Sequence, residues 1–562
     1  MSSVDLLSEI TGFLSGAVRE RLTSWGRGDL AGNIILERPA VKGHGDLSTN
    51  VAMMAAGAAG MPPRDVAAQL ADDFRKNEEL MKLCSDIQIA GPGFINFFLN
   101  DETLIAAAGR ALAEGMDFGS SVITKPESVL LEYVSANPTG PLHAGHARYA
   151  AYGDSLKRIL VYAGHSVTTE FYINDYGTQM LTFGRSLAAR YAELCGRKVK
   201  FPEEGYRGEY TVHIAQLIRE EIGDSMLTDV VPEPDQAAVD FFKKKGCYLV
   251  LGDMRDTLER FRVDFDNWFP ESSLYESGEV DSTLEMLEAA GEVETREGAK
   301  WLLTSRYGDD KDRVLIRSSG EPTYFTSDIA YHREKLARGF DRLINIWGAD
   351  HHGYVPRLRA AFEALSHDPQ KFEIIIGQLV NVIELGERKQ MSKRAGTMVT
   401  LAELLDSIGT DAARFFLVER SNDSTLDLDL EKARLKSEEN PVYYVQYAHA
   451  RICSILKRAA EEGILDSSEG TVETLAEQER ELILKLAEFP RTVLAAAGTR
   501  GPQRITTYAR ELAAIFHIFY HNCPVIRAAP AAAAFRLDLC RLTKNVIARS
   551  LDLVGVKAPE SM

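Results

Sequence analysis

The pattern of hydrophobic and polar positions predicts a separate α/β unit over about the first 115 residues. An amphipathic helix opens the chain, and an alanine-rich helical run extends from Val51 to Gly60. The segment IQIAGPGFINFFLN (residues 87–100) alternates on both sides of a Gly-Pro-Gly turn, as two paired strands do. We find no catalytic pattern in this unit.

From residue 116 onward, short apolar runs are separated by helical stretches. The run Val129–Leu131 leads into a turn and then into a helix from about Ala144 to Leu160, and a second strand begins near Phe171. Further strand patterns follow; they lie at residues 313–317, 342–347 and 372–382. This alternation of strands and helices predicts a parallel sheet of the Rossmann type.

The remaining segments are helical. Residues 186–301 are charged and predominantly helical, and we interpret them as an insertion between the two halves of the Rossmann-type domain. From Thr410 the chain is all-helical. The predicted fold class is therefore α/β, with an N-terminal α/β domain (1–115), a parallel-sheet catalytic domain (116–405) and an all-α C-terminal bundle (406–562).

Composition excludes several classes of protein. The 562 residues are 45% hydrophobic and 26% charged, and no apolar run reaches the roughly 18 residues needed to span a bilayer. The first residues lack the basic and apolar regions of a secretory signal, so we expect a cytoplasmic protein. The six cysteines form no CxxC pair, which argues against structural zinc and disulfides. A net charge of -18 opposes non-specific binding of polyanions, so any nucleic-acid contact needs local basic patches.

The segment LLEYVSANPTGPLHAGHAR (residues 130–148) predicts a strand, a tight turn and a helix. Such a junction directs backbone N–H groups and the positive end of the helix dipole into a cleft, which suits phosphate. His143 and His146 stand three residues apart on the first helical turn, and Gly145 leaves room for a flat ligand. The alternative interpretation is a surface turn with incidental histidines.

Two further segments have the composition of ligand-binding loops. ERKQMSKRAGTMVT (residues 387–400) places Lys389, Lys393 and Arg394 in a basic loop suited to binding a triphosphate, although by itself the segment is more often a solvated surface turn. Gly348-Ala349-Asp350-His351-His352 follows a predicted strand, where α/β folds bind ligands. An Asp-His-His tripeptide is also compatible with a metal pair or a phosphoesterase.

The C-terminal region contains one helix with an unusual polar set. Asn440-Pro441 forms a good N-cap and N1 pair, and Tyr443, Tyr447 and Arg451 follow on nearby turns. These side chains could stack on bases, although aromatic residues in helices more often belong to a core.

HAGH (143–146) and QMSKR (390–394), in this order and with an insertion between them, resemble the two signatures of class I aminoacyl-tRNA synthetases. Within that class the chain most resembles the arginyl-tRNA synthetase family along nearly its whole length. The resemblance rests on NPTGPLHAGHAR, FYINDYGTQM, VDFDNWFPESSLY, YFTSDIAYH, NPVYYVQYAHARI and LVGVKAPESM. Two positions depart from the family: Gln390 replaces the first signature lysine, and the terminus reads PESM instead of PERM.

The resemblance implies arginine--tRNA ligase activity in two steps. ATP and L-arginine would give arginyl-adenylate, and the arginyl group would pass to the 2′-hydroxyl of the terminal adenosine of tRNA for arginine. It implies that His143, His146 and Lys393 are catalytic, and that ATP is bound by these residues together with Gly145, Gly348, Asp350, Lys389 and Arg394. Mg²⁺ would arrive with ATP, and we expect no dedicated metal site.

The resemblance also assigns an arginine pocket. Glu132 and Asp328 match the family's side-chain ligands, and carboxylates suit the five donors of a guanidinium. Asn137, Tyr324 and His351 match neighbouring contacts. Without the resemblance, both carboxylates would pass for ordinary surface residues.

For tRNA, the resemblance assigns the N-terminal unit to the elbow and the C-terminal helices to the anticodon side, with Tyr443, Tyr447, Arg451 and Met562 as contacts. We expect a monomer that does not bind membranes. Two alternatives stay open: a class I synthetase for another amino acid, such as cysteine or lysine, and a catalytically silent synthetase-like binding protein.

Overall fold

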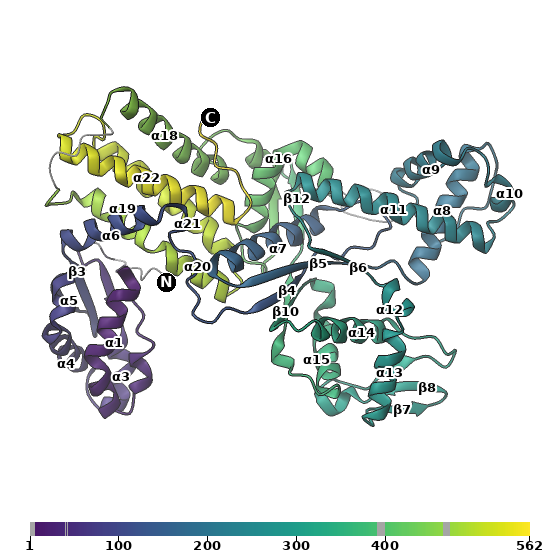
Figure 1. Cartoon of the computed structure of the whole chain (residues 1–562), viewed down its shortest axis with the longest axis horizontal. Coiled ribbons are helices and arrows are strands. Elements are labelled where there is room, and N and C mark those ends of the chain that lie inside the picture. The colour runs from purple at the N-terminus through teal and green to yellow at the C-terminus, as the bar shows by residue number, and fades with distance from the viewer. Residues whose placement is uncertain (1–5, 40, 42, 390–398, 465–471) are drawn as a thin grey trace.

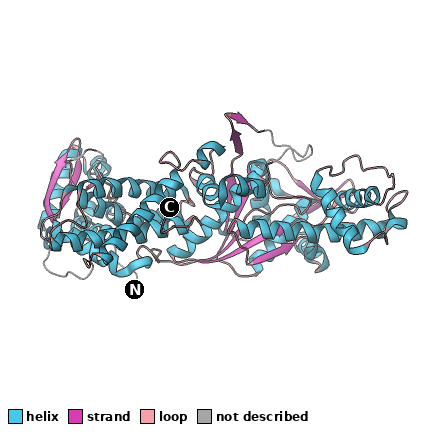
Figure 2. Cartoon of the chain, turned by 90° about the horizontal axis from the view of Figure 1, so that it is seen from above, coloured by secondary structure: helices cyan, strands magenta, loops and turns pink. Residues whose placement is uncertain are grey.

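The chain forms an elongated molecule (Figure 1). A central sheet lies between the N-terminal helices and sheet on one side and the helices of residues 178–260 on the other. The computed structural model describes residues 6–39, 41, 43–389, 399–464 and 472–562, apart from the side chain of Asp350. The N-terminal sheet lies at one end of the long axis and the central sheet lies near the middle (Figure 2). Across these described ranges, no helix is both long enough and apolar enough to cross a membrane.

The N-terminal part packs helices against a small antiparallel sheet of strand order β1-β3-β2. The predicted strand pair is confirmed, because β2 and β3 pair antiparallel around the Gly-Pro-Gly turn. The elements are α1 (Leu6–Ser24), α2 (Gly28–Ala31), β1 (Leu47–Thr49), α3 (Val51–Ala59), α4 (Pro63–Lys76), α5 (Glu78–Leu83), β2 (Cys84–Ala90), β3 (Phe94–Leu99), α6 (Asp101–Glu114) and η1 (Gly115–Asp117).

The predicted Rossmann-type sheet is confirmed. Five strands lie in the order β11-β10-β4-β5-β6, and every neighbouring pair is parallel. These strands are β4 (Ser128–Glu132), β5 (Ser166–Ile173), β6 (Asn267–Pro270), β10 (Arg342–Gly348) and β11 (Phe372–Gly377). Helices α7 (Ala144–Ala163), α14 (Tyr324–Ala337) and α15 (Val355–Ala364) connect or follow them. All carboxyl ends of the five strands therefore meet at one edge.

The region between β5 and β10 contains strands in addition to the helices that the sequence predicts. Four helices form one lobe: α8 (Thr178–Leu194), α9 (Glu209–Ile222), α10 (Leu227–Val230) and α11 (Gln236–Arg260). Strand β6 then rejoins the main sheet, although it falls inside the range 186–301. A second lobe follows with α12 (Ser272–Glu276), α13 (Glu279–Ala289), β7 (Val293–Arg296), β8 (Ala299–Leu302), η2 (Thr304–Tyr307) and β9 (Arg313–Ile316).

Two predicted strands differ from the structure in their partners. β9 pairs antiparallel with β8 instead of joining the parallel sheet. The single strand expected over 372–382 is divided, since β12 (Val380–Glu384) leaves the main sheet and pairs with β13 (Glu387–Arg388) and β14 (Leu426–Asp429). Both runs are apolar, and an apolar run alone does not specify which sheet a strand joins.

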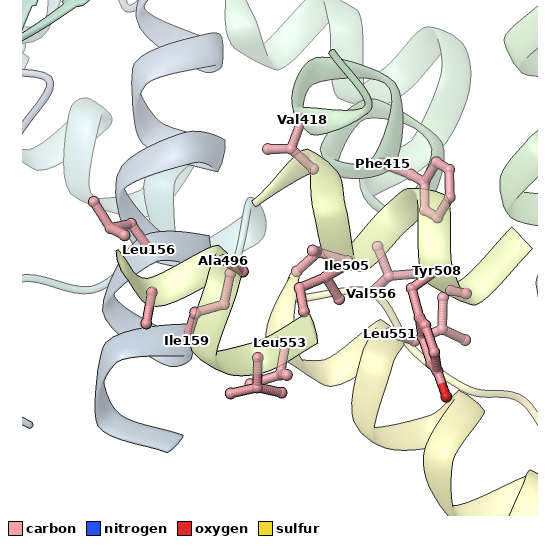
Figure 3. Packing of buried hydrophobic residues seen from close by; sticks show 14 of the residues in the cluster. Leu156, Ile159, Phe415, Val418, Ala496, Ile505, Tyr508, Leu551, Leu553 and Val556 are labelled. Carbon is pink, nitrogen blue, oxygen red and sulfur yellow. The ribbon is translucent and has the colours of Figure 1, made fainter. Parts of the chain in front are cut away.

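The C-terminal part is predominantly helical, as predicted, but it is not all-helical from Thr410, because the strand β14 lies within it and pairs with β12. It contains α16 (Leu401–Val418), α17 (Leu430–Arg434), α18 (Pro441–Glu461), α19 (Glu477–Ala487), α20 (Phe489–Gly498), α21 (Gln503–Asn522) and α22 (Pro530–Leu553). Asn440 caps α18 as expected, with its side chain accepting from the N–H groups of Val442 and Tyr443. These helices share a hydrophobic core with α7, where Leu156 and Ile159 lie near Ala496 of α20 (Figure 3).

Candidate functional site

The first candidate residues lie where β4 gives way to α7 at the carboxyl edge of the sheet. His143 is the N-cap of α7: its Nδ1 accepts from the Gly145 N–H at 3.1 Å, and its own N–H donates to His146 Nδ1 at 3.3 Å. The two rings stack with centroids 3.7 Å apart. A Cβ on residue 145 would lie 2.9 Å from the His143 ring, so a side chain at this position would displace that imidazole. The capping arrangement thus fixes both imidazoles together at a helix N-terminus.

The segment that follows the second signature is hydrogen-bonded to this turn. The Ala144 N–H donates to the Val399 carbonyl at 3.1 Å, and the Leu401 N–H donates to the Leu142 carbonyl at 2.8 Å. On the other side of the signature, Lys389 lies 2.5 Å from Glu384 across the β12–β13 hairpin. Gln390, Lys393 and Arg394 lie outside the described residues. The structure therefore places the residues that follow the second signature next to the first, although 243 residues of the chain lie between HAGH and QMSKR.

Glu132 ends β4 and is buried at 5% exposure. Its carboxylate accepts from Ser135 Oγ at 2.9 Å and from Asn345 Nδ2 at 3.0 Å. The fully buried ammonium of Lys335 forms an ion pair with the same carboxylate. Sequence reasoning missed Lys335, which lies at the end of α14 with nothing in its local sequence to mark it as buried.

Asp328 lies in the second turn of α14. Burial raises the pKa of its carboxyl to about 6, a hydrogen bond from the Tyr354 hydroxyl opposes this shift, and the nearby Glu132 adds to it. The two candidate carboxylates therefore act on one another electrostatically. Tyr354 is a second residue that the sequence analysis missed.

A third carboxylate completes the group. Glu271 directly follows β6, is 2% exposed, and accepts from Ser327 Oγ at 3.1 Å. Its Oε2 has no hydrogen-bond partner among the described residues. The pKa of this carboxyl is raised to about 7, chiefly by burial; Asp328 and Asp175 add to the shift, and Ser327 and the nearby Tyr172 hydroxyl oppose it. A buried acceptor without a donor is costly unless a ligand supplies one, so Glu271 points to a cationic or donor-rich ligand.

The other predicted arginine contacts, Asn137, Tyr324 and His351, are partly or fully exposed. Asn137 Nδ2 donates to Gln179 Oε1 at 2.6 Å, and Tyr324 is 52% exposed at the start of α14. Gly348 ends β10 and pairs in register with Gly377 of β11. His351 is exposed, with its ring centroid 6.0 Å from that of Trp347. The side chain of Asp350 is outside the described part of the chain.

The predicted residues of α18 lie in a separate cleft of about 900 Å³. The rings of Tyr443 and Tyr447 are parallel, with centroids 6.3 Å apart, and the Arg451 guanidinium lies 5.0 Å from the Tyr447 centroid. The cleft is also lined by His517, Tyr520, His521, Arg458 and Arg527. Met562 is 54% exposed at the chain end and is not part of this lining.

Models of known protein families match all three parts of the chain. The family model for the arginyl tRNA synthetase N terminal domain matches residues 12–99. The model for the catalytic domain of class I tRNA synthetases (R) matches residues 109–453, and that for the DALR anticodon binding domain matches residues 445–562.

Similar proteins cover almost the whole chain. An arginine--tRNA ligase of Oceanobacillus iheyensis is 43% identical over 95% of this chain and 95% of its own, and one of Bacillus licheniformis is 45% identical over 94% of each. The crystal structure of a putative arginyl-tRNA synthetase from Campylobacter jejuni aligns with a TM-score of 0.75 at 35% identity, covering 82% of this chain and 99% of that one. The Thermus thermophilus arginyl-tRNA synthetase, at 23% identity, shares the fold with a TM-score of 0.76 over 98% of this chain and 99% of its own. By its matched domains and its relatives, the chain belongs to the arginyl-tRNA synthetase family, within class I of the aminoacyl-tRNA synthetases.

Proposed function

We propose that the carboxyl edge of the central sheet is where ATP activates L-arginine and where the arginyl group passes to tRNA. The reaction is that of the family: arginyl-adenylate forms first, and its arginyl group is then transferred to the 2′-hydroxyl of the terminal adenosine. One observation carries the assignment of the site. The His143 turn is hydrogen-bonded to the residues that follow the second signature, and β4, which leads into this turn, ends at the buried carboxylate of Glu132.

We assign ATP to the side of the site formed by α7 and β10. His143, Gly145 and His146 would hold phosphate and adenosine at the N-terminus of α7, where the helix dipole favours anions. Gly348 and Asp350 would receive the ribose. Lys393, with Lys389 and Arg394, would neutralise the β- and γ-phosphates as pyrophosphate leaves, and Mg²⁺ would be held mainly by the phosphates.

We assign the arginine side chain to the three carboxylates. A guanidinium offers five donors in one plane, and the buried Glu132 and Glu271 and the partly buried Asp328 offer carboxylate acceptors. The unpartnered Oε2 of Glu271 supports this assignment, since a bound guanidinium would give it a donor. Lysine has one compact ammonium and would leave some of these acceptors unpaired, so the pocket should reject it. Asn137, Tyr324 and His351 would contact the remainder of the amino acid.

The chemistry requires no covalent enzyme intermediate. The arginine carboxylate attacks the α-phosphate in line, so catalysis comes from positioning the two substrates and from stabilising negative charge on the phosphates. The parallel sheet serves this purpose because it brings the ends of β4 and β10 together.

We assign tRNA to both ends of the molecule. The C-terminal domain (406–562) would bind the anticodon side through Tyr443, Tyr447, Arg451 and Met562, and the N-terminal domain (1–115) would contact the elbow. Stacked aromatic rings and a nearby guanidinium suit unstacked bases. The middle domain (116–405) would carry the chemistry, and we expect a monomeric cytoplasmic enzyme.

The test of this proposal is a Lys393→Ala variant. If Lys393 stabilises the departing pyrophosphate, activation measured by ATP–pyrophosphate exchange in the presence of tRNA should fall by about 10²–10³-fold. Arginine binding measured by calorimetry should remain nearly normal. Lys82→Ala, at an exposed pair in the N-terminal part, is the control and should change neither value. Unchanged exchange in Lys393→Ala would remove this lysine from the mechanism.

A further inference from the structure

Two tyrosines form an exposed stack on the side of the carboxylate pocket formed by β5 and β6. Tyr176 follows β5 and Tyr275 lies in α12 after β6. Their ring centroids are 3.9 Å apart with 16° between the planes. Tyr176 is 44% exposed, whereas Tyr275 is half-buried. Tyr176 therefore presents one face of its ring to solvent, and Tyr275 packs against the other face.

Hydrogen bonds hold the two turns in fixed relation. The Asp175 carboxylate accepts from the Ser272 N–H at 2.9 Å and from its hydroxyl at 2.8 Å. The backbone N–H of Glu271 donates to the Ile173 carbonyl at 2.9 Å. Gly177 has φ +86°, and a Cβ there would lie 3.1 Å from the Tyr324 hydroxyl. An exposed ring held this firmly is pre-organised for a flat ligand.

The stack is continuous with the arginine pocket. Burial raises the pKa of the Tyr275 phenol to about 12; a hydrogen bond with Ser327 opposes that shift, and Glu271 and Asp328 add to it. Ser327 also donates to Glu271, so one short chain of contacts joins the stack to the carboxylates.

The order of the strands separates this stack from the assigned ATP residues. β10 carries Gly348, β4 carries Glu132 and leads to His143, and β5 and β6 carry the tyrosines. Arginine bound at the end of β4 would thus have ATP on one side and the tyrosine stack on the other. In the second step the terminal adenosine of tRNA must reach the arginine carboxyl. The side with the tyrosine stack is the side of the arginine that the assigned ATP does not occupy.

We propose that Tyr176, supported by Tyr275, is the stacking platform for the terminal adenine of tRNA. This inference rests on the proposed function. A purine has an extended π-face that stacks on aromatic side chains without sequence-specific contacts. Stacking here would place the adjacent ribose, with its 2′-hydroxyl, beside the arginine pocket.

The experiment is a thermodynamic cycle between Tyr176→Ala and loss of the terminal adenosine. Dissociation constants are measured for intact tRNA and for tRNA without its 3′ adenosine, at saturating arginine. Removal of the adenosine should weaken binding to the unmodified enzyme by about 5- to 100-fold, and it should have little further effect on Tyr176→Ala. Tyr176→Phe should retain the full effect because it keeps the ring. Tyr248→Ala, at a 71% exposed tyrosine of α11, should behave like the unmodified enzyme.

Two outcomes would overturn the platform. One is an equal loss on adenosine removal in the unmodified enzyme and in Tyr176→Ala. The other is a higher dissociation constant for free arginine in Tyr176→Ala, because the ring would then contact the amino acid and not the adenine. Charging of tRNA by the unmodified enzyme is measured in parallel. If it charges no tRNA with arginine, the proposed function fails, whatever the cycle shows.

Discussion

At the residue scale, the proposed arginine site combines the buried carboxylates of Glu132 and Glu271 and the partly buried one of Asp328 with a buried lysine. Lys335 is fully buried and forms its ion pair with Glu132, while its ammonium also donates to Asn345 Oδ1 at 3.1 Å. His332 completes the network, because its Nδ1 donates to the Asp328 carbonyl and its Nε2 accepts from Asn345. Lys335 therefore fixes one carboxylate and offsets part of the negative charge.

Replacing Lys335 by methionine should destabilise the protein strongly. A buried ion pair that loses one partner leaves an uncompensated charge, which costs about 3–5 kcal/mol. The urea midpoint of unfolding should fall, and the dissociation constant for arginine should rise. Lys82→Met removes a comparable pair whose side chains are 66% and 59% exposed, and it should cost less than about 1 kcal/mol. Equal effects in the two variants would contradict the role of Lys335.

The raised pKa values of Asp328 and Glu271, about 6 and about 7, predict a pH dependence. Without arginine, the folded state binds more protons than the unfolded state between the ordinary carboxyl range and these values, so stability falls as pH rises through that window. Guanidinium binding requires the ionised forms, so arginine should bind more tightly over the same rise. The thermal shift produced by arginine should therefore increase from pH 5.5 to pH 8.

A Glu271→Gln variant provides the control for this pH dependence. It cannot ionise, so the increase of the arginine-induced shift with pH should become smaller. A shift that is independent of pH in the unmodified protein would show that these carboxyls do not titrate in the pocket.

At the element scale, the helices that follow the two signatures are joined by a buried guanidinium. Arg414 of α16 is fully buried and forms an ion pair with Asp154 of α7. It also donates to the Val554 carbonyl at 2.9 Å and to the Phe261 carbonyl at 2.9 Å. One side chain thus connects both signature helices, the end of α11 and the segment after α22.

Gly555 beside this guanidinium should not tolerate alanine. It has φ +67°, and a Cβ would lie 2.3 Å from Arg414. Gly555→Ala therefore combines backbone strain of about 1–2 kcal/mol with displacement of a buried charge. Gly463→Ala has a similar φ of +70° and meets nothing within 4 Å, so it should show the strain alone. Thermal unfolding should show a larger loss of stability for Gly555→Ala than for Gly463→Ala. Equal losses of stability would mean that Arg414 can move aside without cost.

Local patterns predicted some elements and not others. The strand, turn and helix around His143 lie within one continuous segment, and so do the β2–β3 hairpin and the Asn440 cap; each was predicted from neighbouring residues. The division of 372–382 between two sheets depends on partners far away in the chain. Glu271 and Lys335 were missed for the same reason, because their burial is produced by elements that meet only in the folded protein.

At the scale of the whole molecule, the net charge of -18 must be reconciled with tRNA as a substrate. The C-terminal cleft is lined by Arg451, Arg458 and Arg527 and by one carboxylate, that of Glu438. Attraction of a polyanion depends on such local groups more than on the total charge. The cleft is therefore locally basic within an acidic protein.

The central claim is that this protein ligates arginine, and no other amino acid, to tRNA. The most direct test is aminoacylation of total tRNA by the purified full-length chain with each labelled amino acid in turn, in the presence of ATP and Mg²⁺. We predict charging with arginine alone, with lysine at background. Charging with a different amino acid, or with none, would contradict the account.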